Sequence, residues 1–298
     1  MMSFKPKFSI VIPTYNRAIL LKRCLTSIIN QTVTDWEAIV VDNYSEDNTE
    51  EVVTAFKDDR IRYVKNHNYG IISVSRNKAL DMAVGDWICF LDSDDAWFPN
   101  KLESLIPYLN DYDLIYHGCR KDMKRIHPFQ RLNDYFYEIK DPTVAYVIQR
   151  GDPISPSCSC VSRKIIGTTR FDESKELFAV EDYDFFLQLL HKGIRVKYLR
   201  KILTIYDMGG CSHGEKAIER DARLYKKWGV ILQKQEIEEV NILLKMKTAS
   251  YLTNVGKLKQ AQNLYCQSLK TKILQKKYST LKCLIKVWLL RCFKGFDK

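Results

Sequence analysis

The sequence has no long apolar run and no paired-cysteine motif. A membrane-spanning helix needs roughly 18 consecutive apolar residues, and the longest candidate, residues 284–293, is interrupted by a lysine and an arginine. The chain runs directly from its start into the apolar segment 8–12, so we expect no signal peptide. The nine cysteines are odd in number and none are spaced C-x-x-C. This favours a reducing cytoplasm and argues against a disulfide framework or a zinc site.

Acidic residues are almost absent from the carboxyl-terminal fifth of the chain. Residues 240–298 contain thirteen Lys and Arg and one Asp, a net +12, whereas the whole chain carries +11 and the remainder therefore −1. Residues 283–294 combine apolar side chains, cations and a tryptophan, which is typical of a helix lying on an anionic membrane surface. The alternative is a helix that packs on the rest of the protein. No recognised nucleic-acid module accompanies these cations, so we expect no nucleic-acid partner.

Strand and helix patterns alternate through the first part of the chain. Helical spacing of apolar residues separates short apolar runs, which predicts an α/β fold with a mostly parallel, Rossmann-like sheet and helices on both faces. The expected strands of this part are residues 8–12, 36–41, 61–64, 86–91 and 114–116.

The later part of the chain changes character twice. Residues 121–152 are expected to form an excursion from the sheet, followed by strands at 157–162, 195–198 and 202–206 and a helix at 181–192. Beyond residue 214 the strand patterns end, and four helices are expected. We therefore predict one α/β domain at 1–214 and an all-helical, basic extension at 215–298. The four expected helices are 215–238, 241–254, 258–270 and 274–293.

The run Asp92-Ser93-Asp94-Asp95 directly follows the fourth expected strand. Ligands bind at the carboxyl edge of open α/β sheets, and hard carboxylate oxygens suit Mg²⁺ or Mn²⁺ held together with substrate phosphates. The run therefore predicts a metal–diphosphate site. One alternative is a solvated turn, since Asp and Ser are common turn residues. Another is a phosphoryl-transfer site with an Asp nucleophile, but that pattern requires Thr or Val where Ala96 stands.

Polar residues also follow the other expected strands. Pro13 and Tyr15 end the first strand, Asp42 ends the second, and Arg76 lies on the third expected helix. The pair Glu181 and Asp182 lies at the start of a later helix. Each has a purely structural alternative: a strand terminator, a turn, a surface residue, or acidic residues favoured by the helix dipole. Together they indicate a ligand site along one edge of the sheet.

The order and spacing of these motifs closely resemble those of the family 2 glycosyltransferases, which have a nucleotide-sugar-binding A-type fold. The resemblance covers residues 8 to 215 and rests on the whole set of motifs. It implies that Pro13 and Tyr15 shape the pocket for the base and ribose of a nucleotide donor. It also implies that Asp42 accepts a hydrogen bond from uracil, and that Arg76 reaches the base or the diphosphate.

The same resemblance implies the roles at the reacting end of the donor. Asp92 contacts the ribose or the metal, Ser93 lies against the nucleotide, and Asp94 coordinates Mn²⁺ or Mg²⁺ directly. Asp182, beside Glu181, is the general base.

His213 lies in a glycine-flanked loop and is a further candidate to contact the diphosphate or to complete the metal shell. The alternative is an ordinary loop histidine. As a whole, the resemblance implies an inverting glycosyltransferase that uses a UDP-sugar such as UDP-galactose or UDP-N-acetylglucosamine. The processive signature Gln-x-x-Arg-Trp is absent, which favours addition of one sugar.

The implied acceptor is a lipid-linked glycan in bacterial O-antigen, capsule or lipopolysaccharide synthesis. The implied location is cytoplasmic, peripheral on the inner face of the cell membrane, and a homodimer is left open. Two other functions stay open. A nucleotidyltransferase that makes a nucleotide sugar would need a Gly-rich loop after the first strand, where Pro13-Thr14-Tyr15-Asn16 has no glycine. A helical-repeat adaptor would not need intact acidic motifs.

Overall fold

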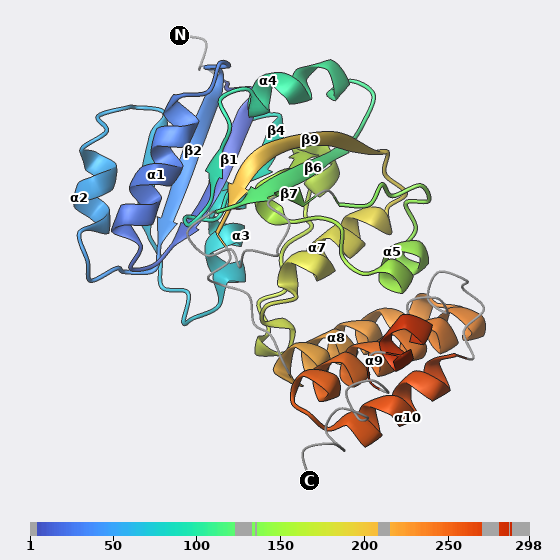
Figure 1. The fold of residues 1–298 in the computed structure, drawn as a ribbon. Helices are drawn as coiled ribbons and strands as arrows, with labels where there is room; N and C mark the ends of the chain where they lie inside the picture. Colours follow the sequence, from blue (N-terminus) through green and yellow to red (C-terminus); the bar gives the residue numbers. More distant parts are fainter. Residues whose placement is uncertain are drawn as a thin grey trace. The chain divides into compact units, whose positions relative to one another are not determined.

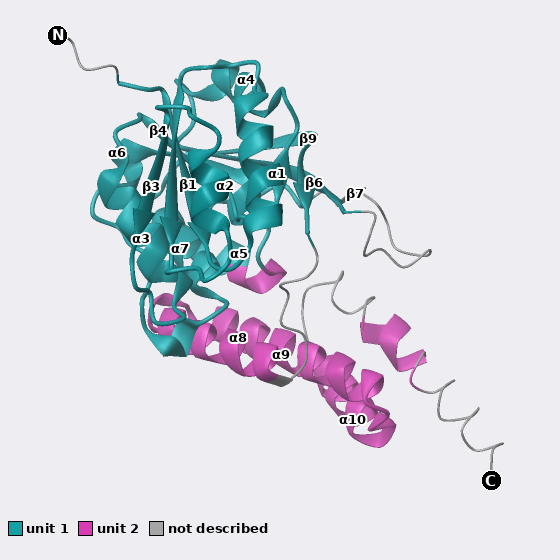
Figure 2. Ribbon diagram, turned by 90° about the vertical axis from the view of Figure 1, so that its left-hand side faces the viewer, with its two compact units in different colours: residues 1–147, 152–211 teal, residues 148–151, 212–298 magenta. Residues whose placement is uncertain are grey.

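The computed structural model of the protein describes residues 5–122, 133–134, 136–207, 215–269, 280–285 and 287. The chain forms two compact units, shown in different colours in Figure 2. Residues 1–147 and 152–211 make up the first unit, and residues 148–151 and 212–298 make up the second. The expected position of His213 lies outside the described residues.

The first unit contains a sheet whose amino-terminal half is entirely parallel. The strands of this half lie in the order β3-β2-β1-β4, and β1, β2 and β4 are buried along their whole length. Parallel strands covered on both faces read as continuous apolar runs, which is why the sequence pattern identifies them. The four strands are β1 (Phe8–Thr14), β2 (Trp36–Asp42), β3 (Ile61–Lys65) and β4 (Trp87–Phe90) (Figure 1).

The other half of the sheet is mixed. Strand β8 (Ser159–Ser162) runs antiparallel to β4 and to β6 (Leu114–Lys121), and β9 (Val196–Tyr206) runs parallel to β6. The short strands β5 (Ala96–Trp97) and β7 (Asn133–Asp134) pair antiparallel with β9 and β6. The expectation of a mostly parallel sheet is confirmed in the half that carries the first four strands.

Strand β9 joins the two short strands expected at 195–198 and 202–206. Its register against β6 shifts between His117 and Gly118, where Leu199 and Ile202 pair with adjacent residues of β6. The two exposed residues between them, Arg200 and Lys201, are accommodated by this irregularity. A bulge keeps a strand continuous across an extra pair of residues, so the polar interruption in the sequence does not end the strand.

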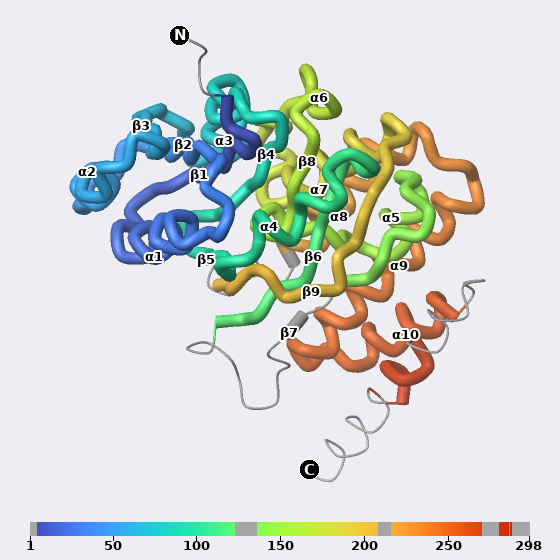
Figure 3. Tube along the Cα trace, turned by 90° about the horizontal axis from the view of Figure 1, so that it is seen from above, coloured from blue at the N-terminus to red at the C-terminus, as the bar shows by residue number. Residues whose placement is uncertain are grey.

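Helices cover both faces of the sheet, as predicted. In Figure 3, α1 and α2 lie on one side of β1 and β2, and α3 lies on the other. Helix α2 is preceded by a turn in which the side chains of Asp42 and Asp47 accept hydrogen bonds from the backbone N–H groups of Ser45 and of Thr49, the first residue of the helix. The helices of the first unit are α1 (Ala18–Ile29), α2 (Thr49–Thr54), α3 (Ile72–Met82), α4 (Lys101–Leu105), α5 (Val144–Arg150, whose last turn belongs to the second unit), α6 (Arg163–Ile166) and α7 (Glu181–Leu190).

All regular secondary structure in the described residues of the second unit is helical. The helix expected at 215–238 ends at Trp228, because the chain turns through a short 3₁₀ segment and restarts at a capping box formed by Gln233 and Glu236. Its helices are α8 (Glu215–Trp228), η6 (Gly229–Ile231), α9 (Lys234–Asn254) and α10 (Leu258–Ser268).

No helix in the described part of the chain is both long and apolar enough to cross a bilayer.

Candidate active site

The acidic run lies in a turn between β4 and β5, at the carboxyl edge of the parallel strands. The N–H of Leu91 donates to the carbonyl of Val11 at 3.0 Å, which keeps the chain in register with β1 until the turn begins. Within the turn, the N–H of Asp95 donates to the carbonyl of Asp92 at 2.9 Å. Ser93 and Asp95 are buried, whereas the Asp92 side chain keeps 28% of its surface exposed. The Asp92 side chain is therefore more accessible than that of Asp94, which keeps 15% of its surface exposed.

Arg76 on α3 joins the acidic turn to the start of α7. Its side chain is 3% exposed, and its two terminal nitrogens donate to Asp92 and Glu181, each at 2.8 Å. Its guanidinium also lies 5.3 Å from the ring centroid of Phe171. Burial lowers the pKa of Arg76, but Asp92 and Glu181 outweigh burial and hold it above its usual range. The three charged groups therefore form one largely buried network, which the sequence motifs did not reveal as a set of contacts.

Asp182 faces a cavity that Asp92 also lines. The cavity has a volume of about 350 Å³. Burial, followed by repulsion from Glu181, raises the pKa of Asp182 to about 7, while Arg76 opposes the shift. A carboxylate with a pKa near neutrality suits a general base. The other lining residues are Cys119, Lys121, Phe136, Asp152, Ile154, Ser155, Pro156 and Tyr206.

Asp94 points to a different set of partners. Its carboxylate forms an ion pair with Arg17, and Arg23 donates to its backbone carbonyl. Burial and the neighbouring Asp92 raise the pKa of Asp94, while Arg17 lowers it. Neither arginine was assigned a role from the sequence. For Arg17, the sign in the sequence was its position at the start of the helix that follows the first strand.

The two carboxylates Asp92 and Asp94 fit a divalent ion whose remaining coordination positions are filled by the substrate. The described residues bring together no three His, Cys, Asp or Glu side chains in a metal-binding arrangement. Mg²⁺ in phosphate-transfer sites, however, usually binds through one or two carboxylates and the substrate's phosphates. A cation between Asp92 and Asp94 would also relieve the repulsion that contributes to the raised pKa of Asp94.

The residues assigned to the nucleoside lie at the ends of β1 and β2. Pro13 is buried and pairs with Val41 across these strands, while Tyr15 keeps 49% of its surface exposed. Asp42 is fully buried and accepts hydrogen bonds from the N–H of Ser45 and, at 2.6 Å, from the hydroxyl of Tyr63. Tyr63 was not singled out from the sequence. A buried carboxylate held in this way is oriented before any ligand arrives.

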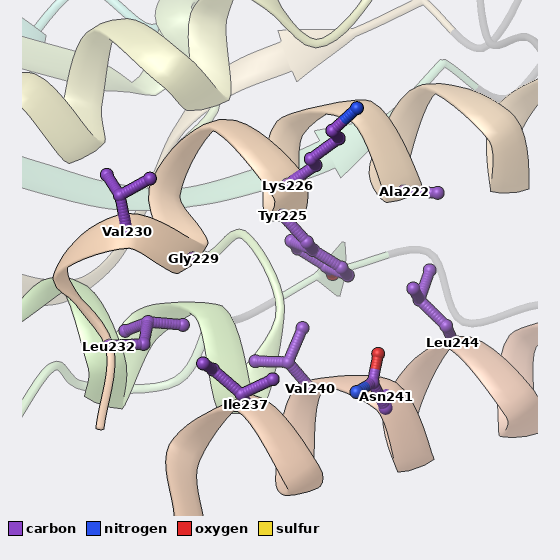
Figure 4. Close-up of a pocket in the computed structure, with 10 residues that line it drawn as sticks. All are labelled: Ala222, Tyr225, Lys226, Gly229, Val230, Leu232, Ile237, Val240, Asn241 and Leu244. Atoms are coloured by element: carbon purple, nitrogen blue, oxygen red, sulfur yellow. The ribbon is translucent and has the colours of Figure 1, made fainter. Parts of the chain in front are cut away.

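A second cavity, of about 380 Å³, lies within the helical unit between α8 and α9 (Figure 4). Its ten lining residues are mainly apolar and include Lys226 but no carboxylate. A base–metal chemistry like that of the first cavity has no candidate residues among these ten. The candidate active site is therefore the cavity at the sheet edge.

Comparison with known proteins identifies the family. The model of glycosyl transferase family 2 matches residues 9–166. An Escherichia coli K12 protein with the provisional name colanic acid biosynthesis glycosyl transferase WcaA is 32% identical over 234 residues, covering 73% of this chain and 77% of that protein. The chain belongs to glycosyl transferase family 2.

Two further likenesses are more limited. The E. coli UDP-Glc:alpha-D-GlcNAc-diphosphoundecaprenol beta-1,3-glucosyltransferase WfgD is 42% identical over 98 residues, which cover 33% of this chain and 39% of that enzyme. The structure of the mannosyltransferase PcManGT of Pyrobaculum calidifontis, in complex with GDP-Man and Mn²⁺, has a TM-score of 0.61. It is 17% identical and covers 96% of this chain and 87% of that one. This likeness establishes the A-type glycosyltransferase fold.

Proposed function

We propose that this protein is an inverting glycosyltransferase that moves one sugar from a nucleotide-diphosphate donor, a UDP-sugar, to a hydroxyl of a lipid-linked glycan. The reaction would belong to the assembly of a surface polysaccharide. Residues 1–214 would carry catalysis, and the basic helical extension at 215–298 would keep the enzyme at the membrane face where such an acceptor lies. The observation that carries this proposal is that Asp92 and Asp182 line one cavity.

In the proposed reaction, Asp182 acts as the base. Its carboxylate takes the proton of the acceptor hydroxyl as that oxygen bonds to the anomeric carbon of the donor sugar. The bond between this carbon and the diphosphate oxygen breaks on the opposite face, and its electron pair leaves with the nucleoside diphosphate. One in-line displacement inverts the anomeric configuration. Arg76 keeps the base and the acidic turn at a fixed spacing through its contacts with Glu181 and Asp92.

The donor would lie along the sheet edge, from β2 to β4. Asp42, Pro13 and Tyr15 would form the nucleoside end, with Arg76 and Ser93 toward the phosphates. A Mn²⁺ or Mg²⁺ ion held by Asp94 and Asp92 would supply Lewis-acid neutralisation of the leaving diphosphate. The name of WfgD gives that enzyme a UDP-glucose donor and a diphosphoundecaprenol acceptor, and PcManGT was solved with Mn²⁺. Both names support the chemical class proposed for this site.

The donor assignment is tested with a panel of nucleotide sugars. We expect Mn²⁺-dependent release of nucleoside diphosphate from one UDP-sugar, and transfer to a polyprenyl-diphosphate glycan with inverted configuration in the product. Release that is unaffected by removal of divalent ions, or a product of retained configuration, would contradict the proposal.

The metal assignment is tested by calorimetric titration of the protein with UDP, in the presence and in the absence of Mn²⁺. Asp94→Ala is expected to lose the metal-dependent part of nucleotide binding. Asp86→Ala is the matched control, because Asp86 is an exposed carboxylate next to the opposite end of β4. Nucleotide binding that is the same in Asp94→Ala and Asp86→Ala would remove Asp94 from the site.

A further inference from the structure

Ser157 contacts the acidic turn and takes no part in the chemical steps of the proposed reaction. It belongs to a short 3₁₀ helix, η3 (Pro156–Cys158), that leads into β8, and its side chain is fully buried. The Ser157 hydroxyl accepts a hydrogen bond from the N–H of Asp92 at 3.0 Å. One buried hydroxyl thus holds the backbone at the first residue of the turn.

The backbone of Ser157 is itself fixed by three buried donors. Its carbonyl accepts hydrogen bonds from Trp97 Nε1 at 3.0 Å, Thr204 Oγ1 at 2.9 Å and Lys101 Nζ at 3.1 Å. These donors come from β5, β9 and α4, so three elements converge on one peptide group. Side chains that hold a functional group in place through locked neighbours give it a defined geometry.

Lys101 strengthens this arrangement with a positive charge under the turn. Its side chain is fully buried, and its ammonium lies 3.3 Å from the ring centroid of Trp97. Burial lowers the pKa of Lys101 to about 8, while the thiols of Cys89, Cys158 and Cys160, followed by Asp95, act in the opposite direction. Three acidic residues occupy four positions of the turn, and Asp92 and Asp94 repel each other there. The hydrogen bond from the Asp92 N–H to Ser157 opposes the separation of the two carboxylates that this repulsion favours.

We propose that Ser157 is a positioning residue that holds the Asp92–Asp95 turn in the geometry required for divalent-metal binding. The proposal rests on the proposed function, since it assumes that Asp92 and Asp94 bind the metal. Residues that orient metal ligands from behind typically change metal affinity by about 10- to 100-fold when they are replaced. We expect a loss of this size for Ser157→Ala.

The test is a titration of the full-length protein with Mn²⁺ in the presence of UDP, followed by the electron paramagnetic resonance signal of free Mn²⁺. Ser159→Ala is the matched control, because Ser159 is equally buried but its hydroxyl donates to the Pro156 carbonyl and not to the acidic turn. Ser157→Cys provides a second variant of similar shape, in which sulfur is a weak acceptor. Thermal unfolding of each variant reports the structural cost separately.

We expect Ser157→Ala and Ser157→Cys to bind Mn²⁺ about 10- to 100-fold more weakly than the wild type and Ser159→Ala. Equal Mn²⁺ affinity in all four proteins would overturn the inference and leave the proposed function intact. An equal loss in Ser159→Ala would also overturn it, because the effect would then be general to the segment. A wild-type protein that binds no Mn²⁺ would overturn both the inference and the metal assignment.

Discussion

Two carboxylates of this site are adjacent in sequence and differ in what surrounds them. Glu181 pairs with Arg76, whereas Asp182 accepts a hydrogen bond from the N–H of Tyr183 and faces the cavity. Burial therefore disfavours the charged form of Asp182 more than its partners favour it, and its pKa rises to about 7. The same environment that makes Asp182 a suitable base also makes its negative charge unfavourable for the folded protein.

The pH dependence of transfer follows from this pKa. Only deprotonated Asp182 accepts a proton, so kcat/KM should rise about tenfold per pH unit below pH 7 and level off above it. Asp182→Asn should lower kcat by about 10²- to 10⁴-fold and leave UDP binding intact. Initial rates between pH 5.5 and 8.5 check the profile. Retention of full activity in Asp182→Asn would refute the base assignment.

Asp182→Asn, which should lower activity, should raise the stability of the folded protein above neutral pH. Because the folded-state pKa of Asp182 lies above the usual value, this group contributes stability at low pH that is lost as the pH rises through about 7. Asp182→Asn removes that charge, so it should unfold at a higher temperature than the wild type at pH 8. The difference should disappear near pH 4. Calorimetric scans at the two pH values measure it.

Loss of Arg76 should destabilise the folded protein, because its side chain is buried between two carboxylates. Replacing it by Met leaves Glu181 buried and Asp92 partly buried, both without their cation, and breaking a buried ion pair on one side typically costs about 3–5 kcal/mol. Because Asp92 is partly exposed, we expect a value near the lower end, measured by urea unfolding. Arg62→Met is the control, since Arg62 pairs with one carboxylate, Glu37, and is 40% exposed. Equal losses in the two variants would contradict a central role for the Arg76 network.

At the scale of elements, the turn before β4 determines how closely that strand approaches β1. Gly85 is buried there, and its N–H donates to the hydroxyl of Ser9 at 2.8 Å. Ser9 in turn donates to Glu37, which also accepts the N–H of Val84. A polar cluster thus closes the end of the parallel strands opposite to the candidate active site. This closure fixes β4, and β4 carries the acidic turn.

A side chain at position 85 should disturb this closure. A Cβ on Gly85 would lie 2.7 Å from the backbone nitrogen of Ser9 and 2.8 Å from the carbonyl carbon of Phe8. Backbone atoms move less easily than side chains, so Gly85→Ala should destabilise the protein by about 1–3 kcal/mol. Gly229→Ala is the control, because a Cβ there would meet no atom within 4 Å. Unfolding midpoints that match in the two variants would show that β1 and β4 can separate at low cost.

At the scale of the whole molecule, local patterns predicted the parallel strands and the residues at their ends. Continuous apolar runs identify buried strands, and the carboxyl edge of such strands is where polar motifs gather. The contacts that assemble the site were not predictable in this way. Arg17 meets Asp94 across 77 residues, and Ser157 meets the Asp92 backbone across 65. The Arg17 contact arises because β1 and β4 are neighbours in the sheet, and the Ser157 contact because β8 inserts antiparallel between β4 and β6. No periodicity in the sequence specifies either strand order.

Shortening the basic extension tests whether it binds a membrane surface, and the structure indicates where the chain can be shortened without opening the helical core. Val287 is fully buried in a cluster with Ala249, Leu258, Ala261 and Tyr265, so removal of residues from 275 onward would expose the core of the helical unit. Removal of residues 288–298 keeps this cluster and deletes Arg291, Lys294 and Lys298 together with Asp297 and Trp288.

Each cation near an anionic lipid surface contributes about 1 kcal/mol, so the shortened protein should sediment less with vesicles that contain phosphatidylglycerol. Its unfolding temperature and its transfer to a soluble acceptor analogue should stay as in the full chain. Neutral phosphatidylcholine vesicles provide the control, because the electrostatic part of binding is absent there. Undiminished sedimentation with the anionic vesicles would mean that residues 288–298 do not hold the enzyme at the membrane. The basic residues between 240 and 287 would then be the next segment to neutralise.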